Sequence, residues 1–210
     1  YVEMEMNALN TTWDLMLVRP YRDGGPPVNA FELHGMRTAV RVDGTLNDPT
    51  DTDRGWSVEI AVPWAALREV ATRPTPPSDG DVWRINFSRV QWKHEVVDGK
   101  IRKQPGPEDN WVWSPIGAID MHRPERWGLL EFVVGDRAPH RRPLESEREA
   151  LMRVYHAQKA YWKEHARYTD DASALGLAPD AQLKIETTSR QFLARLGRFS
   201  VDHESRLRAD

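Results

Sequence analysis

The stretch VWRINFSRVQW, residues 82–92, decides the fold class, because apolar and polar side chains alternate along it. Trp83, Ile85 and Phe87 occupy every second position, with polar residues between them. Successive side chains of an extended strand point to opposite faces of its sheet. The stretch therefore predicts one long strand, with these three residues facing a core and the polar side chains facing the other way.

Further strands are predicted on both sides of this stretch. Runs of strand character lie at residues 1–10, 12–18, 36–46, 56–62 and 129–134, between turns rich in Gly, Pro and Asp. One short helix is predicted at residues 64–71, and a polar loop at residues 93–109. Many short strands with close turns favour a mainly β fold, an antiparallel β-sandwich, for this part of the chain.

The composition changes near residue 136. Residues 1–136 carry 15 Lys and Arg against 21 Asp and Glu, a net charge of −6, whereas residues 137–210 carry 14 against 11, a net charge of +3. Eight of the nine Trp residues lie before this point. We therefore expect two domains, at residues 1–135 and 144–210, with a linker at residues 136–143.

The second domain is predicted to be a long helix followed by a small sheet. Residues 144–168 have a helical period that places Leu144, Leu151, Tyr155 and Trp162 on one face. A β-hairpin is predicted around residues 188–189, and a third strand at residues 199–207.

Several classes of protein are disfavoured by the totals for the 210 residues. The chain has no cysteine, so it has neither a disulfide nor a thiolate metal site. A net charge of −3 argues against a nucleic-acid partner, which requires a clustered basic surface. There is no apolar run of membrane-spanning length. The chain opens on YVEMEM, which reads as a strand already under way, so we expect a segment to precede it.

Three phrases of the first part resemble the family 9 carbohydrate-binding modules. They are GWSVEIAVPW (residues 55–64), GDVWRINFSRV (80–90) and VWSPIGAIDMHRPERWGLLEF (112–132), and the resemblance covers most of residues 1–135. It implies a β-sandwich that binds sugars without catalysis, with calcium as a structural ion. It also implies a larger extracellular or periplasmic protein of carbohydrate catabolism, whose hydrolytic activity belongs to attached domains. The family's first strands would lie upstream of Tyr1.

A shorter phrase in the second part, AQKAYWKEHARYTDDASALGL (residues 157–177), resembles the segment after the long helix of type IV pilin-like proteins. It implies a similar arrangement of helix and sheet. A protein partner that docks on the helix is one role that such an appendage suggests.

The candidate sugar-binding residues come from aromatic and polar positions. In NWVWSP, residues 110–115, Trp111 and Trp113 share one face of a strand. We expect Trp113 to point into the core, and Trp111 to be either a stacking platform for a sugar or a packed residue at the rim. Trp92, at the end of its own strand, has the same two interpretations. Trp56, Trp64 and Trp83 are expected in the core.

Polar side chains supply the remaining candidates. In the family resembled, the polar face of the 82–92 strand carries amide ligands to sugar hydroxyls, which implies this role for Asn86 and Ser88. Glu5, together with Arg84 or Arg89, either adds contacts to the sugar or forms an ion pair with that arginine. The alternative for the whole face is a solvated surface. The predicted sugar-binding set is Glu5, Arg84, Asn86, Ser88, Trp92 and Trp111.

Two other groups of residues have open interpretations. In the loop NDPTDTDRG, residues 47–55, the carboxylates of Asp48, Asp51 and Asp53 are a candidate calcium site, or they cap the turns of their own loop. His122, Arg123 and Glu125 look catalytic, with Glu59 as a possible second acid. A glycosidase, however, requires two acids that face each other across a cleft. The alternatives to a binding module are therefore an enzyme acting on glycosidic bonds and an interaction module whose sugar site has decayed.

Overall fold

The computed structural model describes residues 1–138 and 146–209. The chain divides into two compact units, Tyr1–Pro139 and His140–Asp210, and each is described by itself. This division falls inside the predicted linker at residues 136–143. Most of that linker, and Leu144 of the predicted helix, lie outside the described residues.

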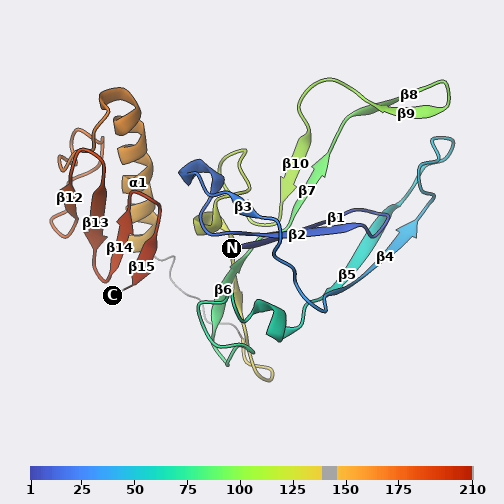
Figure 1. Ribbon diagram of the computed structural model, residues 1–210, viewed down its shortest axis with the longest axis horizontal. Coiled ribbons are helices and arrows are strands. Elements are labelled where there is room, and N and C mark those ends of the chain that lie inside the picture. Colours follow the sequence, from blue (N-terminus) through green and yellow to red (C-terminus); the bar gives the residue numbers. More distant parts are fainter. Residues whose placement is uncertain (139–145, 210) are drawn as a thin grey trace. The chain divides into compact units, whose positions relative to one another are not determined.

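The described part of the first unit consists of short antiparallel strands joined by turns (Figure 1). One sheet has three strands in the order β1-β2-β3, and the other strands pair two by two as β4-β5, β6-β11, β7-β10 and β8-β9. The strands are β1 (Val2–Met6), β2 (Thr12–Leu17), β3 (Pro27–Val28), β4 (Arg37–Asp43), β5 (Gly55–Ala61), β6 (Val82–Ile85), β7 (Ser88–Gln91), β8 (His94–Val97), β9 (Lys100–Lys103), β10 (Asp109–Val112) and β11 (Gly128–Glu131). The prediction of a mainly β, antiparallel fold is confirmed.

The long strand predicted at residues 82–92 is broken at Asn86. β6 pairs with β11, whereas β7 pairs with β10. At the break, the side chain of Asn86 takes the place of backbone hydrogen bonds between strands. Its Oδ1 atom accepts hydrogen bonds from the amides of Ser114 (2.9 Å) and Phe87 (3.0 Å). Its Nδ2 atom donates to the Ser114 carbonyl (3.2 Å). A short amide side chain that bonds to nearby backbone competes with regular secondary structure. The prediction of one strand was therefore wrong.

The polar loop predicted at residues 93–109 was also wrong in part, because β8 and β9 form a hairpin there (Figure 1). Its turn is Asp98-Gly99, and both residues have left-handed backbone conformations, with φ of 52° and 71°. Asp-Gly with two positive φ angles is a preferred two-residue hairpin turn. The short helix predicted at residues 64–71 is a 3-10 turn, η2 (Trp64–Leu67).

The core of the first unit includes a small cluster around Phe31, Leu33 and Ala66. A second group is aromatic: the ring of Trp83 packs edge-on against Trp64, at 5.8 Å between centroids, and against Phe132, at 5.1 Å. Trp83 is half-buried, whereas Trp64 is 41% exposed, so the prediction that Trp64 lies in the core was wrong.

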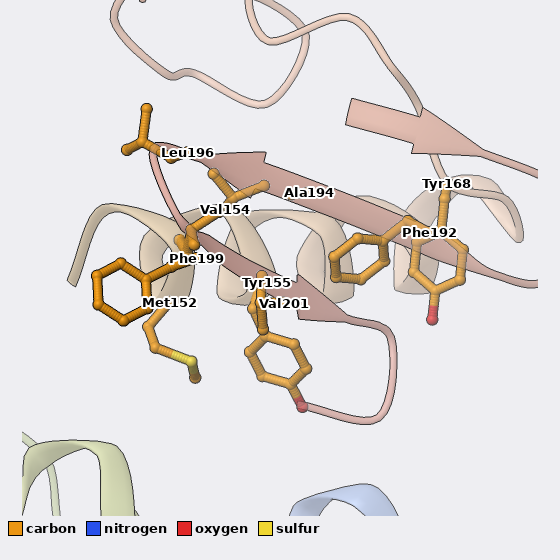
Figure 2. Close-up of a cluster of buried hydrophobic side chains, with 10 residues drawn as sticks. Met152, Val154, Tyr155, Tyr168, Phe192, Ala194, Leu196, Phe199 and Val201 are labelled. Carbon is orange, nitrogen blue, oxygen red and sulfur yellow. The ribbon is translucent and has the colours of Figure 1, made fainter. Parts of the chain in front are cut away.

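In the second unit, α1 (Ser146–His165) packs on an antiparallel sheet with the order β12-β13-β14-β15. The strands are β12 (Lys184–Thr187), β13 (Phe192–Leu196), β14 (Phe199–Asp202) and β15 (Leu207–Ala209). The predicted helix and small sheet are confirmed, although the sheet has four strands. Figure 2 shows the core between helix and sheet, where Tyr155 of α1 lies among residues of β13 and β14.

The buried face of α1 differs from the prediction. Leu151 and Tyr155 are buried as expected, but Trp162 is 44% exposed. Gln158 is fully buried instead, and its side chain bonds to the carbonyl (2.5 Å) and the amide (3.2 Å) of Thr169. Across the described residues, no helix is both long and apolar enough to cross a membrane.

Candidate functional site

The candidate site lies on one face of the β7-β10 ribbon. Arg89 is directly opposite Trp111, and Gln91 is directly opposite Asp109. The pairing continues past the strand ends, because the amide of Trp113 donates to the carbonyl of Phe87 (2.8 Å). Residues that face each other across antiparallel strands share a face of the sheet. We call this surface the ribbon face, and its members are Phe87, Arg89, Gln91, Asp109, Trp111 and Trp113.

Three large aromatic rings stand on the ribbon face, and all are exposed: Phe87 by 58%, Trp111 by 53% and Trp113 by 57%. The rings of Phe87 and Trp113 meet edge-to-face at 5.8 Å between centroids. Trp111 and Trp113 are two residues apart on one chain, a spacing of about 7 Å in an extended strand. The face is therefore a row of aromatic rings that ends in the polar pair Gln91 and Asp109.

Trp113 was predicted to point into the core, and this prediction was wrong. The indole lies against the backbone of Gly128 in β11, where the Cβ atom of any larger residue would approach the ring's Cζ3 atom to 2.5 Å. Gly128 thus provides a flat support for one part of the indole and leaves the rest exposed. Phe87, also predicted to face the core, is exposed because the break at Asn86 separates it from Trp83 and Ile85.

Gly128→Ala is expected to displace the Trp113 indole and to destabilise the first unit by about 1–3 kcal/mol, the usual cost of overpacking. The φ angle of Gly128 is outside the positive range, so the backbone accepts alanine and the effect is steric. Thermal unfolding measures the loss. In a Trp113→Ala background the same substitution should cost much less, and equal costs in both backgrounds would contradict the contact.

The other predicted sugar ligands lie elsewhere. Ser88 faces Val112, on the side of the ribbon opposite the ribbon face, and Trp92 belongs to that side by strand alternation. The Lys103 Nζ atom lies 3.0 Å from the centroid of the Trp92 ring, in a cation–π contact. Glu5 is on β1 opposite Trp13, in another sheet.

Two of the predicted ligands are engaged with the backbone. Arg84 donates from Nη1 to the Trp127 carbonyl (2.9 Å), and the amide of Asn86 holds Ser114. Among the six predicted residues, Trp111 lies on the ribbon face. Arg89 was considered as an alternative to Arg84, whereas Gln91, Asp109 and Phe87 were missed. The sequence signal for them was their position at every second residue, together with Arg89, Trp111 and Trp113.

The aspartates of the predicted calcium loop hold the loop's own turns. Asp48 accepts from the amide (2.9 Å) and the hydroxyl (2.7 Å) of Thr50, and these bonds lower the pKa of its carboxyl. Asp51 accepts from the Thr45 hydroxyl (2.9 Å), and Asp53 from the Thr45 amide (2.7 Å). Within residues 1–138 and 146–209, no group of three or more His, Asp or Glu side chains is arranged to hold a metal ion. The calcium site stays a prediction.

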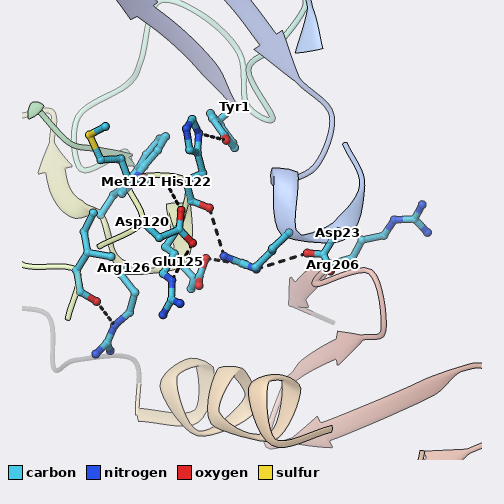
Figure 3. A network of polar contacts seen from close by, with 12 residues as sticks. Tyr1, Asp23, Asp120, Met121, His122, Glu125, Arg126 and Arg206 are labelled. Carbon is cyan, nitrogen blue, oxygen red and sulfur yellow. Dashed lines mark hydrogen bonds and ion pairs between the residues drawn. The ribbon is translucent and has the colours of Figure 1, made fainter. Parts of the chain in front are cut away.

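A polar network joins three segments of the first unit: β1, the 3-10 turn η1 (Tyr21–Asp23) and the turn η3 (Pro124–Arg126) with its preceding loop (Figure 3). The Tyr1 hydroxyl and the His122 Nδ1 atom are hydrogen-bonded at 2.8 Å, and Glu3 Oε2 is 3.5 Å from the same nitrogen. The ring of Tyr21 packs edge-on against His122 at 4.6 Å between centroids.

The remaining contacts of this network fix the backbone around His122. Arg22 pairs with Glu125 (3.0 Å) and donates to the His122 carbonyl (3.3 Å), while Asp120 accepts from the His122 amide (3.0 Å). Glu125 is thus engaged by Arg22, and Glu59 lies on β5 opposite Ala39. The two acids considered for catalysis therefore lie on different elements and have different partners. The contacts of the network connect β1, η1 and the η3 segment to one another.

Glu3→Gln is expected to raise the melting temperature of the first unit at pH 7 and to change it little at pH 3.5. Burial raises the pKa of the Glu3 carboxyl; the nearby His122 opposes this, and Glu5 adds to it. A folded-state pKa above the unfolded value, about 4.3, means that the native state binds the proton more tightly. The stability from Glu3 is therefore full below that value and is lost as the pH rises through the folded pKa.

Thermal melts at both pH values measure this effect, with Glu59→Gln as an exposed control on β5. A lower melting temperature for Glu3→Gln at pH 7 would mean that the carboxylate's attraction to His122 outweighs its burial.

The ribbon face has a composition typical of a ligand site, with exposed aromatic rings beside side chains that donate and accept hydrogen bonds. An open recess of about 340 Å³ at the end of β4 and β5, which includes Arg41 and Arg54, contains none of the predicted ligands. Comparison with protein-family models, with curated proteins and with solved structures found no match to this chain.

Proposed function

We propose that the first unit is a non-catalytic carbohydrate-binding module, and that sugars stack on the ribbon face. The observation that carries the proposal is the pair Trp111 and Trp113, which share one face of β10 and its extension and are both more than half exposed. Exposed large aromatic side chains of this kind mark binding surfaces. The C–H face of a pyranose ring packs on an indole, so two neighbouring indoles suit a chain of at least two sugar units.

The polar members of the ribbon face support the same function. Arg89, Gln91 and Asp109 lie beside the rings and together supply hydrogen-bond donors and acceptors. A sugar offers hydroxyls that need both kinds of partner, whereas a purely apolar ligand needs neither. The β-sandwich of the family 9 carbohydrate-binding modules remains the architecture that we propose for this unit, within a larger extracellular or periplasmic protein.

Titration calorimetry of the intact chain against gluco-, xylo- and manno-oligosaccharides of two to six units tests the proposal. We expect saturable heat with at least one series, and tighter binding of oligomers than of the monosaccharide. A chain that melts cooperatively and yet gives no saturable heat with any of these sugars would overturn it. Repeating the melts with calcium and with a chelator tests the calcium loop, where a higher melting temperature with calcium is expected.

A second candidate function is protein docking through α1. Trp162 of this helix is exposed, and large exposed aromatic residues are enriched in protein interfaces. Two measurements test this candidate separately from sugar binding. One is the self-association of the chain, and the other is the binding of partner proteins to a tagged second unit. Trp162→Ala is the control in each.

A further inference from the structure

The charged residue in the middle of the ribbon face is Arg89. It lies directly opposite Trp111, and its side chain is exposed. Its Nη2 atom donates to the Gln91 Oε1 atom at 3.2 Å, along the same edge of the face. The guanidinium is therefore directed along the row of polar residues, beside the ring on which we propose that a sugar stacks.

Most of the hydrogen-bonding capacity of Arg89 remains available to a ligand. A guanidinium has five N–H donors, and the bond to Gln91 uses one of them. Over the residues described, Arg89 has no ion pair, although Asp109 is the diagonal neighbour on the same face. The planar fork of donors matches a carboxylate, which it binds through two parallel hydrogen bonds.

The two ends of the ribbon face differ in chemistry. At the end formed by Phe87 and Trp113, neither side chain is charged, and their rings meet edge-to-face. At the other end, Gln91 and Asp109 are polar. The cross-strand partner of Trp113 is thus the uncharged ring of Phe87, with Arg89 as a diagonal neighbour, whereas Trp111 has the guanidinium of Arg89 as its direct cross-strand partner.

We infer that the ligand is an acidic oligosaccharide, in which a uronic acid unit stacks on Trp111 and its carboxylate pairs with Arg89. This inference rests on the proposed sugar-binding function and names the class of sugar. Gln91 orients the guanidinium, and Asp109 accepts hydroxyl hydrogens of the next unit. A sulfate substituent is the other anionic group that sugars carry. A guanidinium also binds tetrahedral anions through two hydrogen bonds, so the test below includes a sulfated oligomer.

The test compares an oligomer of galacturonic acid, four units long, with its fully methyl-esterified form, which has the same rings without the charge. Titration calorimetry at low ionic strength should give about tenfold tighter binding of the acid form, the effect of one charge-assisted contact. Raising the salt concentration should reduce this preference, because screening weakens an exposed ion pair. Arg89→Gln should abolish the preference, and Arg89→Lys should retain part of it.

Arg102→Gln is the matched control, since Arg102 is an exposed arginine on β9, outside the ribbon face. It should leave the preference for the acid form unchanged. Equal binding of the acid and the ester, with both lost in Trp111→Ala, would overturn the inference and leave the proposed function standing. Binding of neither form, together with no binding of any neutral sugar, would overturn both. A preference that survives in Arg89→Gln, or tighter binding of a sulfated oligomer, would also overturn the assignment.

Discussion

Tyr155→Ala is expected to lower the free energy of unfolding of the second unit by about 3–5 kcal/mol, the range for deletion of a buried aromatic ring. Tyr155 is 1% exposed, and its ring lies 6.4 Å from that of Phe192, between centroids, in the core between α1 and the sheet. Truncation leaves a cavity in a close-packed core, and the helix and the sheet cannot move together enough to fill it.

Hydrogen exchange of peptides from α1, β13 and β14 measures this loss in the second unit alone. The matched control is Trp162→Ala, which removes a larger aromatic side chain from an exposed position on the same helix. We expect it to cost less than about 1 kcal/mol, as is usual for surface substitutions. Similar losses of protection in the two variants would contradict the placement of Tyr155 at the centre of the core.

Trp111→Ala is expected to weaken sugar binding by about 30-fold or more, equivalent to the loss of an interface residue worth 2 kcal/mol. Trp111 sits in the middle of the ribbon face, so its truncation removes the stacking surface next to Arg89. Titration calorimetry with the tightest sugar of the panel measures the change.

Trp92→Ala is the control for this prediction. Trp92 is also an exposed tryptophan close to the ribbon, but it belongs to the opposite side and its ring is in contact with Lys103. Its replacement should change the affinity by less than about threefold. A large loss in Trp92→Ala with none in Trp111→Ala would move the site to the side that carries Ser88.

Local patterns in the sequence were enough to predict most strands of the first unit. The alternation at residues 1–10, 36–46 and 56–62 corresponds to β1, β4 and β5. An alternating pattern can be recognised within a single strand, without knowledge of the strand that pairs with it. The hairpin β8-β9 was missed because each face of its short arms mixes charged residues with Val96, Val97 or Ile101, so the sequence shows no clear alternation. The dipeptide Asp98-Gly99 nevertheless predicts a hairpin turn, and the positive φ angles of both residues confirm that turn.

The site was harder to predict because it depends on contacts between residues far apart in the chain. Trp113 is exposed because it rests on Gly128, and nothing within NWVWSP identifies that glycine. Phe87 is exposed at the break in the strand, where Asn86 bonds to Ser114, 28 residues away. The same limit applies to α1, where a helical period places Trp162 on the face of Tyr155 although the sheet does not cover that end.

The most direct test of the ribbon face is the NMR spectrum of the tryptophan indole N–H groups during titration with a sugar. The chain has nine tryptophans, and single Trp→Phe variants assign the signals of Trp111, Trp113, Trp92 and Trp83. Stacking on the ribbon face predicts saturable shifts of the Trp111 and Trp113 signals, with Trp92 and the core residue Trp83 unchanged. Shifts confined to Trp92, or saturable binding with no change at Trp111 and Trp113, would contradict the account.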